Sequence, residues 1–219
     1  MSQRDIDQLD QFARYGVATV YEAAGRVGLI DIPLHQIIPG SRVAGPACTV
    51  MCGDGDNLMV HAAMAAVQPG EVLVLAQPNP QPIAMLGGLL ATQAKVHQAA
   101  GIIVDGAIRD VDELHALGLP IWARWIRARA ASKTEVGTIN RSVVIGAASI
   151  AHGDIVVLDS DGACVVAAER AAEVLKAADE RAEREAALQG KLEQGALTYD
   201  VHGLRAFVEG KAGPTKPEH

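Results

Sequence analysis

The chain has 219 residues, of which 49% are hydrophobic and 3% aromatic, with 19 basic and 26 acidic side chains and a net charge of −7. This hydrophobic fraction can build a sizeable aliphatic core, which excludes a disordered or fibrous protein. The sequence has no basic stripe, so we expect no nucleic-acid partner. The polar segment Met1 to Asp10 has no secretory signal, and no apolar run approaches the roughly 18 residues that cross a bilayer. We therefore expect a cytoplasmic protein without a membrane partner.

Three cysteines, Cys48, Cys52 and Cys164, make an odd count in a long chain, which fits a reducing compartment better than a disulfide scaffold. The spacing of the first two is not the two-residue gap of a redox or zinc motif. We expect each cysteine to behave as a small buried hydrophobic residue.

Strand-like and helix-like segments alternate along the chain, which is typical of an α/β fold. We find neither an internal repeat nor a linker, and we predict a single domain over residues 1–210 with a disordered tail at 211–219. In chain order the expected elements are a helix over 4–28 with a break near Tyr15-Gly16, a strand over 42–51, a helix over 57–66, a strand over 71–76, a loop over 77–82, a helix over 89–99, a strand over 101–104, a helix over 111–117, and strands over 120–123, 142–145, 155–158 and 163–167.

A long Ala/Glu/Arg-rich helix is predicted from Ala168 to about Leu188. Its apolar positions, from Ala171 through Ala178 to Ala186, follow the 3.6-residue period. Glu185 falls within about 20° of Ala178 on the same stripe. This carboxylate is either a rim position near a fraying helix end or a group delivered to the site of a neighbouring subunit.

The segment Gly87-Gly88-Leu89-Leu90 places two glycines before a predicted helix. A helix start leaves backbone N–H groups unpaired and partly positive, which suits a carboxylate or a phosphate.

The segment from Asp105 to Asp110 follows a predicted buried strand, and loops at the carboxyl ends of such strands commonly hold ligands. Arg109 offers a planar donor fork for a carboxylate and a keto oxygen, and Asp110 offers oxygens suited to Mg²⁺ or Mn²⁺. A purely structural interpretation is equally open here. Asp110 with Glu113 has the spacing of a helix cap, and Arg109 can simply pair with Asp105.

Other polar residues carry weaker signals. Asp56 and Asn57 lie at a probable helix start, where capping is the default role. The histidines, His61 among them, show no metal-ligand spacing and are expected at surface or helix positions. Residues 132–134 follow a basic stretch, Arg124 to Arg129, which could bind a second carboxylate.

Several stretches resemble the class II pyruvate aldolases that cleave 4-hydroxy-4-methyl-2-oxoglutarate and 4-carboxy-4-hydroxy-2-oxoadipate, a family that also includes the regulator of ribonuclease activity A. They occur in family order at Gly16–Arg26, Gly55–Met59, Gly88–Thr92, Val104–Asp110, Leu119–Arg124 and Gly153–Val157. The resemblance implies a single-domain β/β/α swivelling fold with a long C-terminal helix, assembled as homotrimers or homohexamers with sites between subunits.

The resemblance also implies roles for individual residues. Arg109 would hold the carboxylate and keto oxygen of pyruvate, Asp110 would bind a divalent metal, and the amides of Leu89 and Leu90, after the Gly87-Gly88 loop, would receive the pyruvate carboxylate. Glu185 is the most plausible match to the acidic residue that the family supplies from a neighbouring chain's C-terminal helix.

One position departs from the family. The residue twenty-one positions before the arginine is acidic in the family motif and supports the metal's water shell, whereas here it is Gly88. Such outer groups normally tune metal affinity by about 10–100-fold.

Two functions follow as expectations. The first is an Mg²⁺- or Mn²⁺-dependent lyase that releases pyruvate from a 4-hydroxy-2-oxo di- or tricarboxylate, a small keto-acid substrate, with accompanying oxaloacetate decarboxylase activity. The second is a non-catalytic protein-binding regulator, which Gly88 favours and the retained Asp110 opposes.

Overall fold

The computed structural model of the protein describes residues 3–210, so the predicted tail at 211–219 lies outside the described residues. The chain divides into two compact units, the first ending at Ala178 and the second beginning at Asp179. Among the described residues, no helix has both the length and the apolar character needed to cross a membrane.

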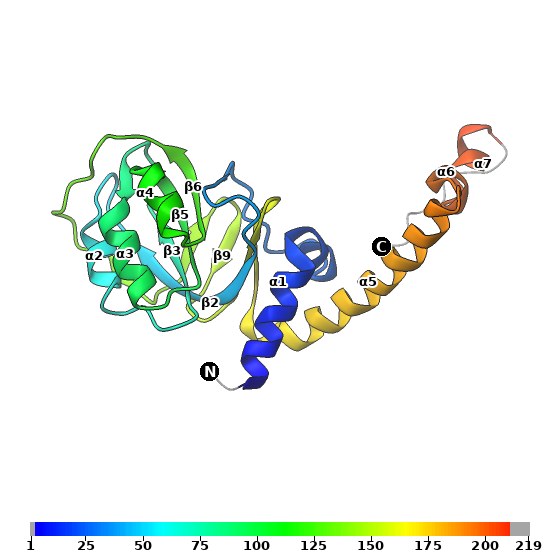
Figure 1. Ribbon diagram of the computed structural model, residues 1–219, viewed down its shortest axis with the longest axis horizontal. Helices are drawn as coiled ribbons and strands as arrows, with labels where there is room; N and C mark the ends of the chain where they lie inside the picture. The colour runs from blue at the N-terminus through cyan, green and yellow to red at the C-terminus, as the bar shows by residue number, and fades with distance from the viewer. Residues whose placement is uncertain (1–2, 211–219) are drawn as a thin grey trace. The chain divides into compact units, whose positions relative to one another are not determined.

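The first unit is built on a mixed sheet with the strand order β1-β6-β5-β3-β2-β10-β11, in which β4 also pairs with β5 and β7 with β2, beside a separate β8–β9 hairpin (Figure 1). The strands are β1 (His35–Gln36), β2 (Val43–Met51), β3 (Val72–Ala76), β4 (Ala84–Leu86), β5 (Gly101–Ile108), β6 (Ile121–Ile126), β7 (Thr138–Ile139), β8 (Val143–Ile145), β9 (Ala148–Ile150), β10 (Ile155–Asp159) and β11 (Gly162–Val166).

Helices lie before, between and after these strands in the chain. They are α1 (Gln3–Ala23), α2 (Leu58–Ala63), α3 (Gly88–Val96), α4 (Val111–Leu117), a short 3-10 helix (Ala168–Arg170), α5 (Ala171–Glu193), α6 (Thr198–Val201) and α7 (Leu204–Val208). The boundary between the two units falls within α5.

The core of the first unit lies on both faces of the parallel strands β2, β3, β5 and β6. Alternate residues of β3 face opposite sides, so Leu73 and Leu75 pack with α2, α3 and α4, while Val72 and Val74 pack with the β8–β9 hairpin. Every residue of β3 and β5 is buried. This is the pattern of parallel strands covered on both faces, and it explains their continuous aliphatic sequences.

Helix α1 is broken where the sequence predicted a break. Gly16 has a positive φ of 75°, and the amide of Val17 donates to Asp159 Oδ2 at 2.9 Å, so Asp159 caps the second half of the helix. A Cβ at residue 16 would overlap the same oxygen, which explains the glycine. The predicted extension to Gly28 is wrong, because Gly25 and Arg26 adopt positive φ and the helix ends at Ala23.

Residues 105–108, which we predicted as a loop, instead continue β5 to Ile108. These residues pair with β6, as in Ala107 with Trp125 and Ile108 with Ile126, and with β4, a short strand that the sequence did not indicate. The helix predicted over 57–66 is also shorter, since α2 ends at Ala63. The short strands β1, β7 and β9 were not predicted either.

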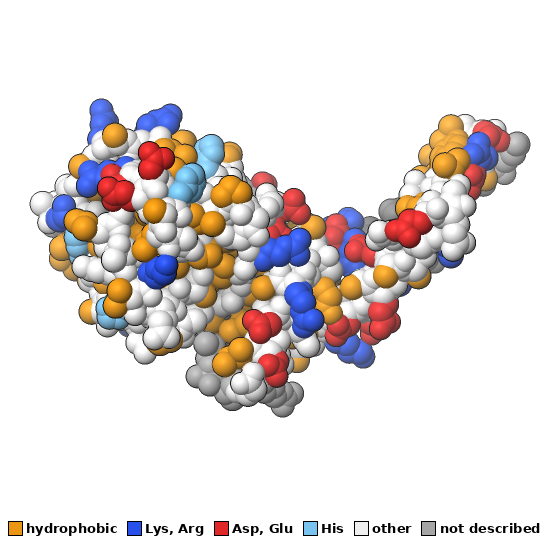
Figure 2. Space-filling model, in the orientation of Figure 1, with side chains coloured by type: hydrophobic (Ala, Val, Ile, Leu, Met, Phe, Trp, Pro, Cys, Tyr) orange, Lys and Arg blue, Asp and Glu red, His pale blue; other side chains and the backbone are white. Residues whose placement is uncertain are grey.

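The second unit contains the rest of α5 together with α6 and α7. Its apolar side chains are largely exposed, as the orange atoms over α6 and α7 in Figure 2 indicate. The exposed large apolar residues of this unit are Leu197, Val201, Leu204, Phe207 and Val208.

Candidate active site

Arg109 and Asp110 stand at the carboxyl end of β5, between that strand and α4. The amide of Arg109 donates to the carbonyl of Leu86 at 3.1 Å, which fastens this turn to the end of β4. The Arg109 side chain is 46% exposed and its Nε lies 3.5 Å from Asp110 Oδ2. The two side chains are therefore held beside each other at the sheet edge where α/β proteins commonly bind ligands.

Asp110 has a strained backbone and does not cap α4. Its φ of 60° and ψ of 42° lie in the left-handed region, and its carboxylate makes no hydrogen bond to the helix amides. Oδ2 instead accepts a hydrogen bond from the amide of Gly88 at 3.1 Å. The capping interpretation is thus wrong. A non-glycine residue in this region costs of order 1–3 kcal/mol, and such residues cluster at functional sites.

The alternative pairing of Arg109 with Asp105 is also wrong. Asp105 is 2% exposed and makes an ion pair with Arg124 Nε at 2.8 Å, between the neighbouring strands β5 and β6. Burial raises the pKa of Asp105, and the charge of Arg124 opposes that rise. Arg124 is therefore committed to a structural carboxylate, whereas Arg109 keeps its guanidinium available.

The glycine loop presents free amides to the same place. Helix α3 begins at Gly88, and Gly87 at its N-cap has no side chain to satisfy the first amides. Among the described residues, we find no hydrogen-bond acceptor for the amides of Leu89 and Leu90. A Cβ at residue 87 would overlap Asp110 Oδ2 and lie 3.2 Å from Arg109 Cγ. Gly87 is required for this close approach.

Gly88, the position that departs from the family motif, lies against Glu113 of α4. A Cβ at residue 88 would overlap Glu113 Oε2, so the carboxylate of Glu113 occupies the space into which a side chain at residue 88 would extend. The backbone of Gly88 is helical, without a positive φ. From the sequence, Glu113 was expected only as part of a helix cap. Its position beside Gly88 follows from the packing of α3 on α4.

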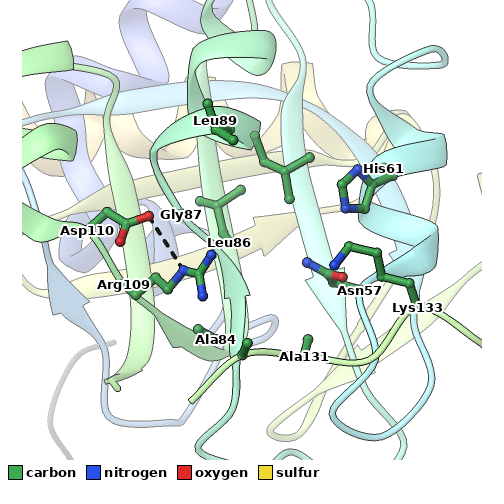
Figure 3. Close-up of a pocket in the computed structure, with 12 residues that line it drawn as sticks. Asn57, His61, Ala84, Leu86, Gly87, Leu89, Arg109, Asp110, Ala131 and Lys133 are labelled. Atoms are coloured by element: carbon green, nitrogen blue, oxygen red, sulfur yellow. Dashed lines mark ion pairs between the residues drawn. The ribbon is translucent and has the colours of Figure 1, made fainter. Parts of the chain in front are cut away.

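These groups line a cavity of about 210 Å³ (Figure 3). That volume is below the roughly 300–1,000 Å³ of sites for drug-sized ligands, so it suits a small metabolite. The lining residues are Asn57, His61, Ala84, Leu86, Gly87, Leu89, Leu90, Arg109, Asp110, Ala130, Ala131 and Lys133.

Three polar lining residues, Asn57, His61 and Lys133, were absent from the predicted site. Signals for them existed in the sequence, because Asn57 lies in the family-like stretch Gly55–Met59 and Lys133 follows the basic stretch. Asn57 makes no capping hydrogen bond at the start of α2, contrary to expectation, and its Nδ2 donates to the carbonyl of Met85 at 3.1 Å. His61 is exposed on α2, as expected, but it also faces the cavity.

Asp56 fastens the wall that carries these three residues. It is fully buried and accepts hydrogen bonds from the amides of Leu58 (2.9 Å), Thr134 (2.6 Å) and Glu135 (3.3 Å). Burial alone would raise the pKa of Asp56, but these hydrogen bonds outweigh it and lower the pKa to about 2. Asp56 therefore caps α2, as expected, and also holds the loop on the far side of Lys133.

The described residues offer few direct ligands for a metal ion. They contain no cluster of three or more His, Cys, Asp or Glu side chains able to hold an ion. Asp110 nevertheless offers one carboxylate to the cavity, and Glu113 stands beside the same glycine. Mg²⁺ usually keeps several waters and binds through one or two carboxylates. The chain's own residues thus fit an ion held largely through water.

Glu185 lies in the second unit, within α5. Its Oε1 makes an ion pair with Arg181 Nε at 2.8 Å, and the side chain is 51% exposed. The apolar stripe that we predicted to continue to Ala186 is buried only as far as Ala178, because Ala182 is half-buried and Ala186 is exposed. A role for Glu185 in a neighbouring subunit's site stays a prediction.

The cysteines behave as the sequence predicted. Cys48, Cys52 and Cys164 are free and buried, and burial raises the pKa of each thiol to about 12. Thiols in this state are not nucleophiles at neutral pH.

The fold and the cavity together define a class of protein. It is an α/β protein with a small site at the carboxyl ends of parallel strands, in which an arginine and two free helix amides can receive a carboxylate beside an aspartate. The chain belongs to the RraA-like family, described as Aldolase/RraA, whose model matches residues 17–165.

Individual relatives agree with this assignment. A protein of Halalkalibacterium halodurans named "Putative 4-hydroxy-4-methyl-2-oxoglutarate aldolase" is 33% identical over 98% of this chain and 100% of its own length. An uncharacterized protein from Pseudomonas syringae pv. tomato has the same fold, with a TM-score of 0.77 at 23% identity, over 87% of this chain and 94% of that one.

A third relative comes from the regulator side of the family. RraAS2 of Streptomyces coelicolor, described as an unusual member of the RNase ES inhibitor RraA protein family, aligns with a TM-score of 0.71 at 27% identity, over 84% of this chain and 96% of that one. The expected family and fold are confirmed.

Proposed function

We propose that the protein is a divalent-cation-dependent lyase that releases pyruvate from a 4-hydroxy-2-oxo di- or tricarboxylate by a retro-aldol reaction, and that it also decarboxylates oxaloacetate. One observation carries the proposal. Arg109, the strained Asp110 and the free amides of Leu89 and Leu90 converge on a single small cavity. The name of the Halalkalibacterium relative supports the same reaction class.

The residues of the chain suggest how the substrate would be held. The planar fork of Arg109 suits the carboxylate and 2-oxo oxygen of the pyruvyl end, since it can donate to both at once. The amides of Leu89 and Leu90 add two donors for the carboxylate, at the positive end of α3. Gly87 lets the substrate approach these groups without steric hindrance.

The bond change follows from this placement. The 4-hydroxyl gives its proton to water and the bond between C3 and C4 breaks, so C4 becomes the carbonyl carbon of the second product, which leaves. The electron pair of the broken bond forms a double bond between C2 and C3, and negative charge collects on the 2-oxo oxygen. Arg109 would stabilise that charge where it develops. Protonation at C3 then gives pyruvate.

Asp110 would hold the divalent cation, Mg²⁺ or Mn²⁺, with Glu113 acting through its water shell. When bound, the cation supplies Lewis acidity at the keto oxygen. Glu113 would thus take the place of the acidic side chain that the family has at the position of Gly88.

A coupled assay tests the proposal. Pyruvate released from 4-hydroxy-4-methyl-2-oxoglutarate or oxaloacetate is followed with lactate dehydrogenase, in chelator-treated protein and after addition of Mg²⁺ or Mn²⁺. Because divalent cations decarboxylate oxaloacetate without enzyme, the same buffer with the cation and without the protein gives the background. Pyruvate release no faster than this background with either substrate would refute the lyase.

The second candidate is a non-catalytic protein-binding regulator. It is favoured by Gly88 and by the likeness to the Streptomyces RNase ES inhibitor relative. The two candidates separate in the assay above, because a regulator binds a protein partner without releasing pyruvate.

We further propose a homo-oligomer, a trimer or a hexamer. Its support is the run of exposed apolar side chains in the second unit, among them Leu197, Leu204 and Phe207, and the exposed end of the apolar stripe at Ala186. Light scattering coupled to size-exclusion chromatography gives the number of chains, and a monomer would contradict the proposal.

A further inference from the structure

The cavity has two polar ends, and the reaction proposed above uses only one of them. Arg109 and Asp110 lie at one end, while Asn57, His61 and Lys133 lie at the other (Figure 3). A pyruvyl group bound at the first end directs C4 and its hydroxyl toward the second. A group that receives the proton of the 4-hydroxyl is therefore expected at the second end.

Four ionisable side chains line the cavity, those of His61, Arg109, Asp110 and Lys133. A guanidinium is not deprotonated in proteins, and an ammonium group is a donor without an acceptor. Asp110 is assigned to the cation in the proposed function. A neutral imidazole has one ring nitrogen that accepts a proton, and histidine can take up and release a proton near neutral pH. Of the lining side chains, that of His61 is thus suited to receive the proton.

The ring of His61 is free, and its backbone is held in place. His61 is exposed on α2, and among the described residues neither a hydrogen bond nor an ion pair to its ring is found. Its amide donates to the carbonyl of Asn57 at 3.2 Å, and Asp56 caps the start of the same helix by accepting from the amide of Leu58 at 2.9 Å. The ring is therefore within reach of both the cavity and solvent.

Asn57 shows where a hydrogen-bond donor is needed. The residue is 8% exposed, its Nδ2 donates to the carbonyl of Met85 at 3.1 Å, and its Oδ1 is buried without a donor. A buried acceptor without a donor is costly. A water molecule would satisfy this oxygen with one hydrogen and keep its other hydrogen and its lone pairs for further partners.

The spacing of Asn57 and His61 suits a shared water. The two residues lie one helical turn apart on the same side of α2, and side chains four residues apart on a helix have Cβ atoms about 5–6 Å apart. One water with a partner at about 2.8 Å on each side spans such a gap. This water can donate one hydrogen to Asn57 Oδ1 and the other to a ring nitrogen of His61, while a lone pair accepts from the 4-hydroxyl.

We propose that Asn57 Oδ1 and the ring of His61 hold the water that takes the proton of the 4-hydroxyl, and that His61 receives this proton from the water. The inference rests on the proposed function for the reaction and for the orientation of the substrate. The O–H bond of the substrate breaks and its electron pair completes the new carbonyl at C4, an N–H bond forms on the ring, and the water keeps two hydrogens. The ring then gives its proton to bulk water while C3 takes one from water, so no net proton is gained or lost.

Oxaloacetate decarboxylation provides an internal comparison. It breaks the same bond between C3 and C4 and leaves the same pyruvate enolate at Arg109, but its second product is carbon dioxide and no hydroxyl loses a proton. The ratio of kcat for cleavage of 4-hydroxy-4-methyl-2-oxoglutarate to kcat for decarboxylation is measured in Mg²⁺ for the wild-type protein, His61→Gln, Asn57→Ala and the control His97→Gln. His97 is an exposed histidine directly after α3 that does not line the cavity.

We expect His61→Gln to lower this ratio by about 100-fold, at the lower end of what a proton-transfer group contributes. Asn57→Ala should lower it too, in a protein that melts at a lower temperature because the hydrogen bond to Met85 is lost. His97→Gln should keep the wild-type ratio. In His61→Ala, added imidazole should restore cleavage and not decarboxylation, because the exposed position admits a free base in place of the ring.

The outcomes separate this inference from the proposed function. A wild-type protein that cleaves the substrate, but whose ratio is unchanged in His61→Gln or in Asn57→Ala, is a lyase without this proton acceptor. Cleavage by His61→Ala that does not respond to imidazole would also overturn the proposal and leave the lyase standing. A wild-type protein that cleaves no 4-hydroxy-2-oxo acid would overturn both.

Discussion

Substitutions that remove the carboxylate from residue 113 and place one at residue 88 give the sharpest test of the metal site. A Cβ at residue 88 would overlap Glu113 Oε2, so a side chain there and the carboxylate of Glu113 compete for one volume. We expect Glu113→Ala to weaken Mg²⁺ binding by about 10–100-fold, as loss of an outer-shell group typically does. We expect the double variant Gly88→Asp/Glu113→Ala to recover most of that loss.

The single variant Gly88→Asp has a different expected result. The overlapping atom is the end of an exposed, flexible side chain, and the backbone of residue 88 has no positive φ, so the substitution itself should cost little. Two carboxylates about 4 Å apart in water repel by about 1 kcal/mol. For a protein of this size that lowers the melting temperature by about 2–4 °C without metal, and added Mg²⁺ should offset the loss.

Calorimetric titration with Mg²⁺ and thermal melts with and without the ion measure both effects. Asp112→Ala is the matched control, because it removes an exposed carboxylate from the first turn of α4. Unchanged Mg²⁺ affinity in Glu113→Ala, or a double variant no better than Glu113→Ala alone, would refute the assignment of Glu113 to the water shell.

Three further predictions concern single residues. Arg109→Lys should lose most pyruvate release with an unchanged melting temperature, because lysine keeps the charge but not the bidentate grip; unchanged turnover would remove Arg109 from the mechanism. Asp110→Asn should abolish cation-dependent turnover at a stability cost of at most about 1 kcal/mol, because asparagine keeps an oxygen that can accept from the amide of Gly88, and full activity at ordinary Mg²⁺ would exclude a metal role. Asp56→Asn should remove about 2.5 kcal/mol of stability at pH 7, from the fall in its pKa from 3.8 to about 2. Because that pKa is lowered by folding, the wild-type protein should lose the same stability between about pH 4 and pH 2, and urea melts in which both proteins lose equally over this range would contradict it.

Much of the fold could be predicted because the central strands can be recognised from their own local sequences. β3 and the first half of β5 are continuous aliphatic runs bounded by glycine, and the helix between Asp110 and Gly118 begins and ends at recognisable residues. The short strand β4 has no such signal, since three residues show no period. The second half of β5 contains Asp105 and Gly106, which favour a loop locally, and pairing with β4 and β6 overrides that preference.

The candidate site also contains residues that could be predicted from the local sequence and residues that could not. Arg109, Asp110 and the glycine loop could be predicted because each lies beside a strand end that the sequence reveals. The meeting of Asn57 and Lys133 at this cavity could not be predicted, because it depends on the bridge between Asp56 and Ser132, two segments far apart in the chain. No local pattern encodes that pairing, although the buried Asp56 that stabilises it lies within a family-like stretch.

The four basic residues of 124–133 show why charge alone could not identify the one that lines the cavity. In sequence they are equivalent members of one basic stretch, and Arg124 is as good a carboxylate ligand as Lys133. The distinction arises from strand pairing, because Asp105 on β5 faces Arg124 on the adjacent β6 and neutralises it at 2.8 Å. Lys133 lies beyond the end of β6, where no carboxylate of the described residues pairs with it and the cavity begins. A buried acid on one strand thus decides which cation of the next segment remains available for a substrate.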